Sequence, residues 1–282
     1  MAKVARAWTA TAVVVFGAAS AQCSLLPSLD DLSGGQGAPD ASDEGPRDAS
    51  PAGDGGDGGS GSDGGRWCAS LSPAPMFCDD FDDQGPFKLW TDQYLRASAT
   101  VARDGTAFRS APNAFLVNAP ASVDPSSALV YLSTTATKSK VRVAYDMRID
   151  ARDPPTGYAE INYIHFGSQF AIYMRVHADP TQDTSLAIEA YLPDGGIPSH
   201  DIAIAGKPRF DGWRRVGVVL DVASTPRTLT ITMDGSFAGS QVLEPNLYQP
   251  GPVKVDLGIG YTDRPSSSDW TVRYDNVTID WE

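Results

Sequence analysis

Apolar and polar residues alternate with a period of two along most of the chain after residue 66, and helical periodicity is nearly absent. In the run from 141 to 149, every second residue from Val141 is apolar, whereas Arg142, Asp146 and Arg148 fall on the other side. The run from 228 to 233 repeats the pattern and is followed by Asp234 and Gly235, a pair typical of a tight hairpin turn. Such alternation predicts half-buried strands. We therefore expect an all-β domain, built as two antiparallel sheets packed face to face.

The alternation stops where the composition changes, and this divides the 282 residues into three segments. Residues 1–22 have the pattern of a signal peptide, because Lys3 and Arg6 precede an uncharged apolar run that is too short to span a bilayer. Residues 23–65 form an anchor region and a linker. Residues 33–65 hold twelve Gly and seven acids, which predicts disorder because such a segment has too little apolar area to fold. Residues 66–282 form the folded domain.

The charge and the cysteines are best interpreted segment by segment. The whole chain has a net charge of −13, but the folded domain, with 19 basic and 26 acidic residues, carries only −7. Such a balance argues against a nucleic-acid partner, which requires a basic surface. Cys68 and Cys78 lie close together in an exported chain, so we expect a disulfide between them rather than two free thiols or a metal pair.

Cys23 stands at the predicted signal cleavage site and leaves two alternatives open. Lipidation of Cys23 predicts an envelope lipoprotein that touches the membrane through its lipid alone, and Ser24 then favours the outer membrane. Cleavage after Ala21 instead predicts a secreted protein. Gln22 is unusual before a lipidated cysteine, whereas the polar tether that follows is typical of lipoproteins. Lipidation is the preferred interpretation.

Four short motifs, in this order, resemble the concanavalin A-like lectin and glucanase superfamily. The domain opens with FCDDFD at 77–82, SAPNAF follows at 110–115, TITMDG lies at 230–235, and the chain closes with YDNVTID at 274–280. The resemblance covers nearly all of residues 66–282 and implies a jelly roll with one convex and one concave sheet. It assigns no function by itself, because this fold carries hydrolases, lyases, lectins and spacers.

Glucanases of this superfamily carry an E-x-D-x-x-E strand that supplies nucleophile, middle Asp and general acid. Matched onto this chain, Glu160 takes the nucleophile position, Asn162 replaces the middle Asp and His165 replaces the acid. Strict alternation places Glu160 and Asn162 on one face and His165 on the other unless a bulge intervenes. Retention of configuration needs two close carboxyl groups, so the sequence does not support hydrolysis, and Glu160 remains the only weak catalytic candidate.

The polar side chains of the expected concave sheet form a candidate ligand-binding surface. Aromatic rings that stack on sugar faces and planar polar groups that bind hydroxyls alternate along its strands. We expect this surface to contain Arg142, Arg148, Tyr158, Glu160, Asn162, Gln169, Tyr173, Arg175, Glu189 and Tyr191. Polysaccharide lyases of the fold use similar residue types, but their local motifs are absent here. An ordinary solvated sheet is the alternative, since Tyr is also a good strand former.

Acidic residues gather at the two ends of the folded domain. The resemblance implies that the first and last strands pair, which brings Asp80 and Asp82 near Asp275. Carboxylates of this kind suit Ca²⁺, and we expect a structural calcium ion as the one candidate cofactor. The alternative is that these acids cap turns and solvate an edge strand.

Together these features predict a monomeric cell-envelope lipoprotein that displays a non-catalytic carbohydrate-binding, adhesion or scaffold domain. A polysaccharide-degrading enzyme and a protein-interaction module without glycan binding are the alternatives.

Overall fold

The computed structural model describes residues 67–82, 87–122, 124–153, 157–168, 170–179, 181–182, 184–192, 196–206, 208–263 and 269–282. The predicted signal peptide, Cys23 and the linker lie outside these residues. In the described part of the chain, no helix is long and apolar enough to cross a membrane. The one helical element with given bounds is the short 3-10 helix η2 (Trp67–Ser70), and the strands form two antiparallel sheets.

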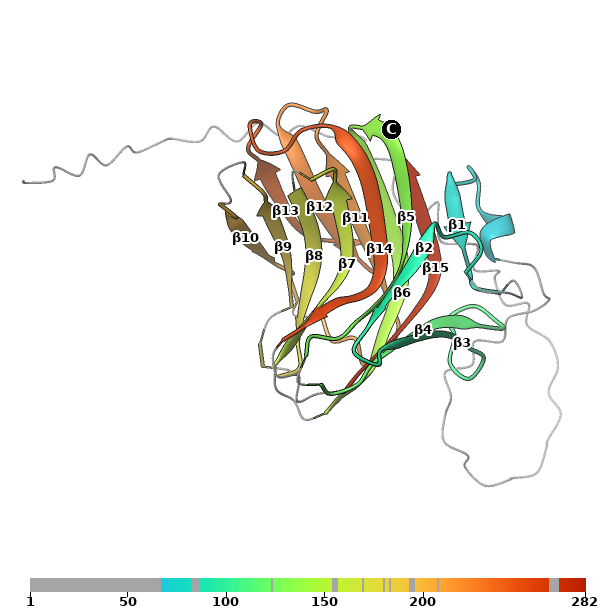
Figure 1. Ribbon diagram of the computed structural model, residues 1–282. Coiled ribbons are helices and arrows are strands. Elements are labelled where there is room, and N and C mark those ends of the chain that lie inside the picture. Colours follow the sequence, from blue (N-terminus) through green and yellow to red (C-terminus); the bar gives the residue numbers. More distant parts are fainter. Residues whose placement is uncertain are drawn as a thin grey trace, which may run out of the picture.

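Figure 1 shows the two sheets packed face to face. Among the described residues, the first sheet has eight strands: β13 (Ser236–Leu243), β12 (Arg227–Met233), β11 (Arg214–Asp221), β6 (Lys140–Asp153), β15 (Asp269–Trp281), β4 (Ala114–Ala119), β3 (Thr100–Asp104) and, beside β15, β1 (Phe77–Asp79). The second has seven: β10 (Ser199–Ala203), β9 (Ser185–Ala190), β8 (Phe170–His177), β7 (Tyr158–Phe166), β14 (Gly251–Thr262), β5 (Ser127–Lys138) and β2 (Asp92–Arg96).

The inner faces of both sheets supply the core, as the alternation predicts. On β6, Val141, Val143, Tyr145, Met147 and Ile149 are each at most 3% exposed. On β8, the residues from Phe170 to Val176 that point inward are buried in the same cluster. The chain therefore adopts the predicted jelly-roll sandwich, because each strand has one apolar face and the two faces bury each other.

Local features near the ends of the domain also follow the sequence. Asp234 and Gly235 both have positive φ, of 51° and 76°, and join β12 to β13 in the expected hairpin. Phe77 of β1 pairs with Ile279 of β15, so the first and last strands lie side by side.

The predicted disulfide is confirmed, since Cys68 and Cys78 are bonded over a separation of ten residues. It ties η2 to β1. Closing so short a loop contributes about 2–3 kcal/mol in the chain-entropy model.

Candidate functional site

Seven of the ten tyrosines of the chain lie on the outer face of the seven-stranded sheet. We call this surface the tyrosine face. Its tyrosines are Tyr94 on β2, Tyr131 on β5, Tyr158 and Tyr163 on β7, Tyr173 on β8, Tyr191 just after β9, and Tyr261 on β14. Tyr173 is buried at 1% exposed, because its neighbours on the face cover it, whereas Tyr94 and Tyr191 are 51% and 39% exposed.

A β-bulge in β7 decides which of its side chains reach this face. The pairing of β7 with β8 shifts between Ile161 and Ile164, and Asn162 within the shift has a φ of 56°. The extra residue changes the alternation, so Glu160, Tyr163 and His165 all lie on the outer side. Strict alternation had separated Glu160 from His165, and the bulge overrides it.

Asn162 itself turns inward, so the prediction that it lies on the ligand-binding surface is wrong. It is 8% exposed, its amide nitrogen lies 3.7 Å from the sulfur of Met147, and its amide oxygen accepts a hydrogen bond from the backbone N–H of Gly258. Its physical role is to satisfy a backbone donor beside the bulge. Asn is one of the few residues that adopt positive φ readily.

Arg142 and Arg148 were also predicted on this surface, and that placement is wrong. Both belong to β6, which lies in the eight-stranded sheet. Arg142 pairs with Glu282 at 2.6 Å and Arg148 with Asp150 at 2.5 Å. Their alternation was interpreted correctly, but alternation does not determine which sheet a strand joins. Gln169, a further predicted residue, lies outside the described residues.

The remaining six predicted residues share the tyrosine face: Tyr158, Glu160, Tyr173, Arg175, Glu189 and Tyr191. Their placement there does not by itself test whether they bind a ligand. What the structure adds is a network of contacts among them and with residues that the sequence did not single out.

Arg175 is the centre of this network. Its guanidinium donates to the hydroxyl of Tyr173 at 2.8 Å and lies 3.4 Å from a carboxylate oxygen of Glu160. On the other side it pairs with Asp201 of β10 at 3.2 Å. Its planar head also lies 5.4 Å from the ring centre of Tyr158 and 5.5 Å from that of Tyr173. Arg175 is thus held by two carboxylates and two rings, which fixes its orientation.

The tyrosine hydroxyls donate to carboxylates. Tyr163 donates to Glu160 at 2.7 Å, and Tyr173 donates to Glu189 at 2.7 Å. Burial, together with the nearby carboxylates, raises the pKa of both phenols well above the ordinary value. Both tyrosines therefore stay neutral donors at physiological pH and are not available as phenolate bases.

A second cluster, formed by His165, Lys254 and Asp256, lies next to this network. Asp256 is 4% exposed, and one of its carboxylate oxygens contacts His165 Nε2 at 3.0 Å and accepts from Lys254 at 2.9 Å. The other oxygen, Oδ1, is buried and has no hydrogen-bond partner among the residues that the structure describes. Lys254 also lies 4.7 Å from the ring centre of Tyr131. Both His165 and Lys254 are therefore engaged within the face.

The rings of the face stack on one another and on a glycine. Tyr163 stacks with Tyr173 at 4.9 Å and with His165 at 5.5 Å between ring centres. The ring of Tyr163 fills the space in which a Cβ on Gly260 would stand, at 2.2 Å from that position. Gly260 is thus the residue that lets this ring lie flat on the sheet.

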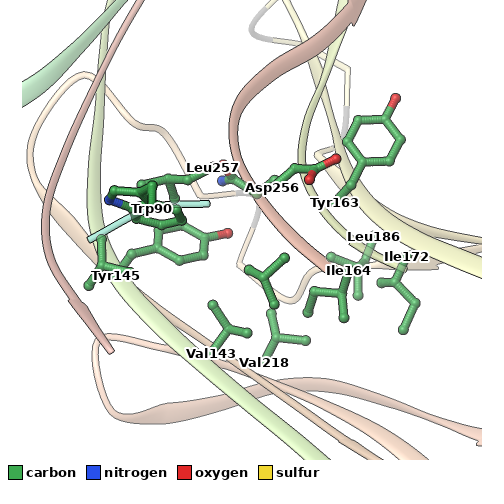
Figure 2. A pocket seen from close by; sticks show the side chains of 13 residues that line it. Trp90, Val143, Tyr145, Tyr163, Ile164, Ile172, Leu186, Val218, Asp256 and Leu257 are labelled. Atoms are coloured by element: carbon green, nitrogen blue, oxygen red, sulfur yellow. The ribbon is translucent and has the colours of Figure 1, made fainter. Parts of the chain in front are cut away.

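A small pocket lies behind this face, between the two sheets. Apolar core residues such as Val143, Ile172 and Val218 line most of it, and Figure 2 shows Trp90 and Tyr145 at one end and Tyr163 and Asp256 at the other. Because its walls are mainly core side chains of both sheets, it is a packing gap. A bulky ligand would have to bind on the open face instead.

The acids predicted to hold calcium are engaged with hydrogen-bond donors. Asp80 accepts from the backbone of Cys68 and Asp82 from that of Asn113, whereas Asp275 accepts from Arg109 and Ser110. Among the residues that the structure describes, no group of three or more His, Cys, Asp or Glu side chains is placed to hold a metal ion. A structural calcium ion at these residues stays a prediction.

The comparisons with known proteins identify the fold alone. No family model and no curated protein matches the chain. A glucuronan lyase from the fungus Trichoderma reesei aligns over 73% of this chain and 95% of its own, with 14% identity and a TM-score of 0.56. A mixed-linkage glucan GH16 protein from Bacteroides ovatus aligns over 72% and 99%, with 12% identity and a TM-score of 0.53. The chain therefore has the concanavalin A-like jelly-roll fold.

Proposed function

We propose that this protein binds a polysaccharide across its tyrosine face without cleaving it. The observation that carries the proposal is the gathering of seven tyrosines, interleaved with planar charged side chains, on one side of one sheet. Six of them are at least partly exposed to a ligand, whereas Tyr173 is buried beneath its neighbours and only supports them. The C–H faces of sugar rings pack on aromatic rings, and sugar hydroxyls bind carboxylates and guanidinium groups. Both kinds of partner are present on adjacent strands here.

The dimensions of the face suit an extended chain. From β9, which Tyr191 follows, to β2, which carries Tyr94, the sheet order crosses five strand intervals. At roughly 4.8 Å per interval, this is about 24 Å, enough for several sugar units. The side chains are also held in place before any ligand arrives, which lowers the entropy cost of binding.

The contacts of Glu160 favour binding over hydrolysis. One of its oxygens accepts from Tyr163 and the other lies near Arg175. A retaining hydrolase needs a second carboxyl group about 5 Å from the nucleophile to act as the acid. The matching position is His165, which is already engaged with Asp256.

Two exposed tyrosines at opposite ends of the face test the proposal. We expect Tyr94→Ala and Tyr191→Ala each to weaken binding roughly five- to tenfold, because one stacked ring contributes about 1 kcal/mol or more. Affinity electrophoresis in gels that contain soluble polysaccharides measures the effect as lost retardation. Phe237→Ala is the matched control, since Phe237 is 68% exposed but lies on β13 of the other sheet. Equal retardation of all three variants and the wild type would contradict the proposal.

Cleavage of the polysaccharide is the second candidate, and one observation favours it. The bulge places His165 on the same side as Glu160, as the two ends of the E-x-D-x-x-E pattern require. The same polysaccharides, incubated with the protein, would then gain reducing ends, and Glu160→Gln would abolish the gain.

The place of the protein in the cell rests on residues outside those described. We propose that Cys23 carries a lipid that anchors the domain in the cell envelope, in the outer membrane. Mass spectrometry of the mature protein should find Cys23 as its first residue with the mass of a diacylglycerol group. A mature chain that begins at Gln22 without lipid would show instead that the protein is secreted.

A further inference from the structure

The two cations on the central strands of the tyrosine face, Arg175 and Lys254, are paired with carboxylates, and this restricts the charge that a ligand can carry. We infer that the face accepts neutral polysaccharides and excludes polyuronates and other anionic chains. The inference rests on the proposed function, since it names the class of polysaccharide that the same surface takes.

The cations on the central strands are already neutralised. Arg175 contacts the carboxylates of Glu160 and Asp201, and Lys254 contacts that of Asp256. To form an ion pair with either cation, a uronate would have to displace a carboxylate of the protein. The exchange gains little, because one ion pair replaces another and the displaced carboxylate stays close to the ligand.

The carboxylates of the face outnumber these two cations. Glu189 accepts a hydrogen bond from Tyr173. Among the described residues, it forms no ion pair with Arg175 or with Lys254. At the edge of the sheet, Asp92 on β2 accepts from Tyr131, while Arg96 on the same strand adds one positive charge. The net charge of the tyrosine face is therefore negative. A polyanion is repelled across its length, particularly at low salt, where the Debye length is long.

The hydrogen-bonding character of the face points the same way. The hydroxyls of Tyr163 and Tyr173 are used as donors to Glu160 and Glu189, so what these groups offer to a ligand is mainly carboxylate lone pairs. Sugar hydroxyls donate to such acceptors, whereas a uronate carboxylate brings only further acceptors. The same atoms that bind a neutral chain therefore disfavour an acidic one.

Asp201 is the residue that makes this inference testable. Its side chain is 52% exposed on the edge strand β10, so its substitution should leave the fold intact. Asp201→Asn removes one negative charge and frees one side of Arg175. We expect this variant to bind polyglucuronate at least severalfold more tightly, relative to a neutral mixed-linkage β-glucan, than the wild type does. Asp211→Asn is the matched control, because Asp211 is also exposed but lies in the turn before β11.

The experiment compares both polysaccharides by affinity electrophoresis at low and high salt. We expect the wild type to prefer the neutral glucan by about tenfold or more at low salt, and the preference to shrink as salt screens the repulsion. Equal or tighter binding of polyglucuronate by the wild type would overturn the inference and leave the proposed function standing. A wild type that binds neither polymer, nor any other in a wider panel, would overturn the proposed function and the inference with it. An equal shift in Asp211→Asn would show that net charge, and not this face, sets the preference.

Discussion

Replacing Arg175 with methionine is expected to abolish measurable polysaccharide binding and to destabilise the fold by about 2 kcal/mol. Methionine keeps much of the volume but leaves Glu160 and Asp201 facing each other without a cation, and the hydroxyl of Tyr173 loses its donor. Breaking a fully buried pair costs about 3–5 kcal/mol, and the smaller figure allows for the 22% exposure of this side chain. The rings of Tyr158 and Tyr173 also lose their cation–π contacts with the guanidinium group.

The matched control is Arg142→Met on the opposite sheet. Arg142 pairs with Glu282, but the two side chains are 39% and 62% exposed, so the pair contributes little. We expect the free energy of unfolding of this variant to lie within about 0.5 kcal/mol of that of the wild type, and we expect it to bind polysaccharide normally. Urea unfolding and affinity electrophoresis measure the two effects. If the two variants have the same stability and the same affinity for polysaccharide, Arg175 does not hold the side chains of the face in place.

The sequence predicts the face that each strand buries better than it predicts the neighbours of each strand. Alternation placed Arg175 and Glu189 correctly on the polar sides of β8 and β9. It also placed Arg142 on the polar side of β6, but β6 pairs with β11 and β15 in the other sheet. Alternation with a period of two indicates on which face of its strand a side chain lies. Which sheet the strand joins depends on contacts between segments far apart in the chain.

The bulge in β7 is the second feature that the spacing of residues does not predict. One extra residue moved Asn162 inward and brought Tyr163 and His165 to the outer face. A signal was present, since Asn tolerates positive φ and interrupts the pattern between Ile161 and Ile164. Lys254 and Asp256 were missed for a different reason. They lie on β14, far along the chain from β7, and join the site only through the pairing of the two strands.

The edge strands show a further limit of pattern reasoning. All five residues of β2 are exposed, and only Ile202 of β10 is buried. An edge strand with so little apolar area shows no clear alternation, so alternation alone does not predict either strand. The tyrosine of β2 nevertheless extends the face, so the surface is wider than the sequence indicated.

The second large effect is expected on the eight-stranded sheet, where Arg215 lies among buried acids. Arg215 contacts Asp146 at 3.5 Å and donates to the backbone carbonyl of Asn276. Asp146 is 8% exposed and Asp275 is fully buried. Arg215→Met leaves Asp146 without its cation, and we expect a loss of about 3 kcal/mol in the free energy of unfolding at pH 8. Arg214→Met is the control, because its pair with Asp234 is exposed and contributes little.

The pH dependence of this loss separates an electrostatic cause from lost packing. Burial raises the pKa of Asp146, and it raises that of Asp275 to about 8 despite the donors around it. A carboxyl whose pKa is higher in the folded state binds its proton more tightly there, so the contribution of these two groups to stability is greatest at low pH and is lost as pH rises from about 4 through about 8. Removing Arg215 raises the pKa of Asp146 further, because the cation that lowers it is gone, and this enlarges the total loss of stability at high pH. Urea unfolding at pH 5 and pH 8 should therefore show a smaller loss for Arg215→Met at pH 5, and an equal loss at both would assign the effect to packing alone.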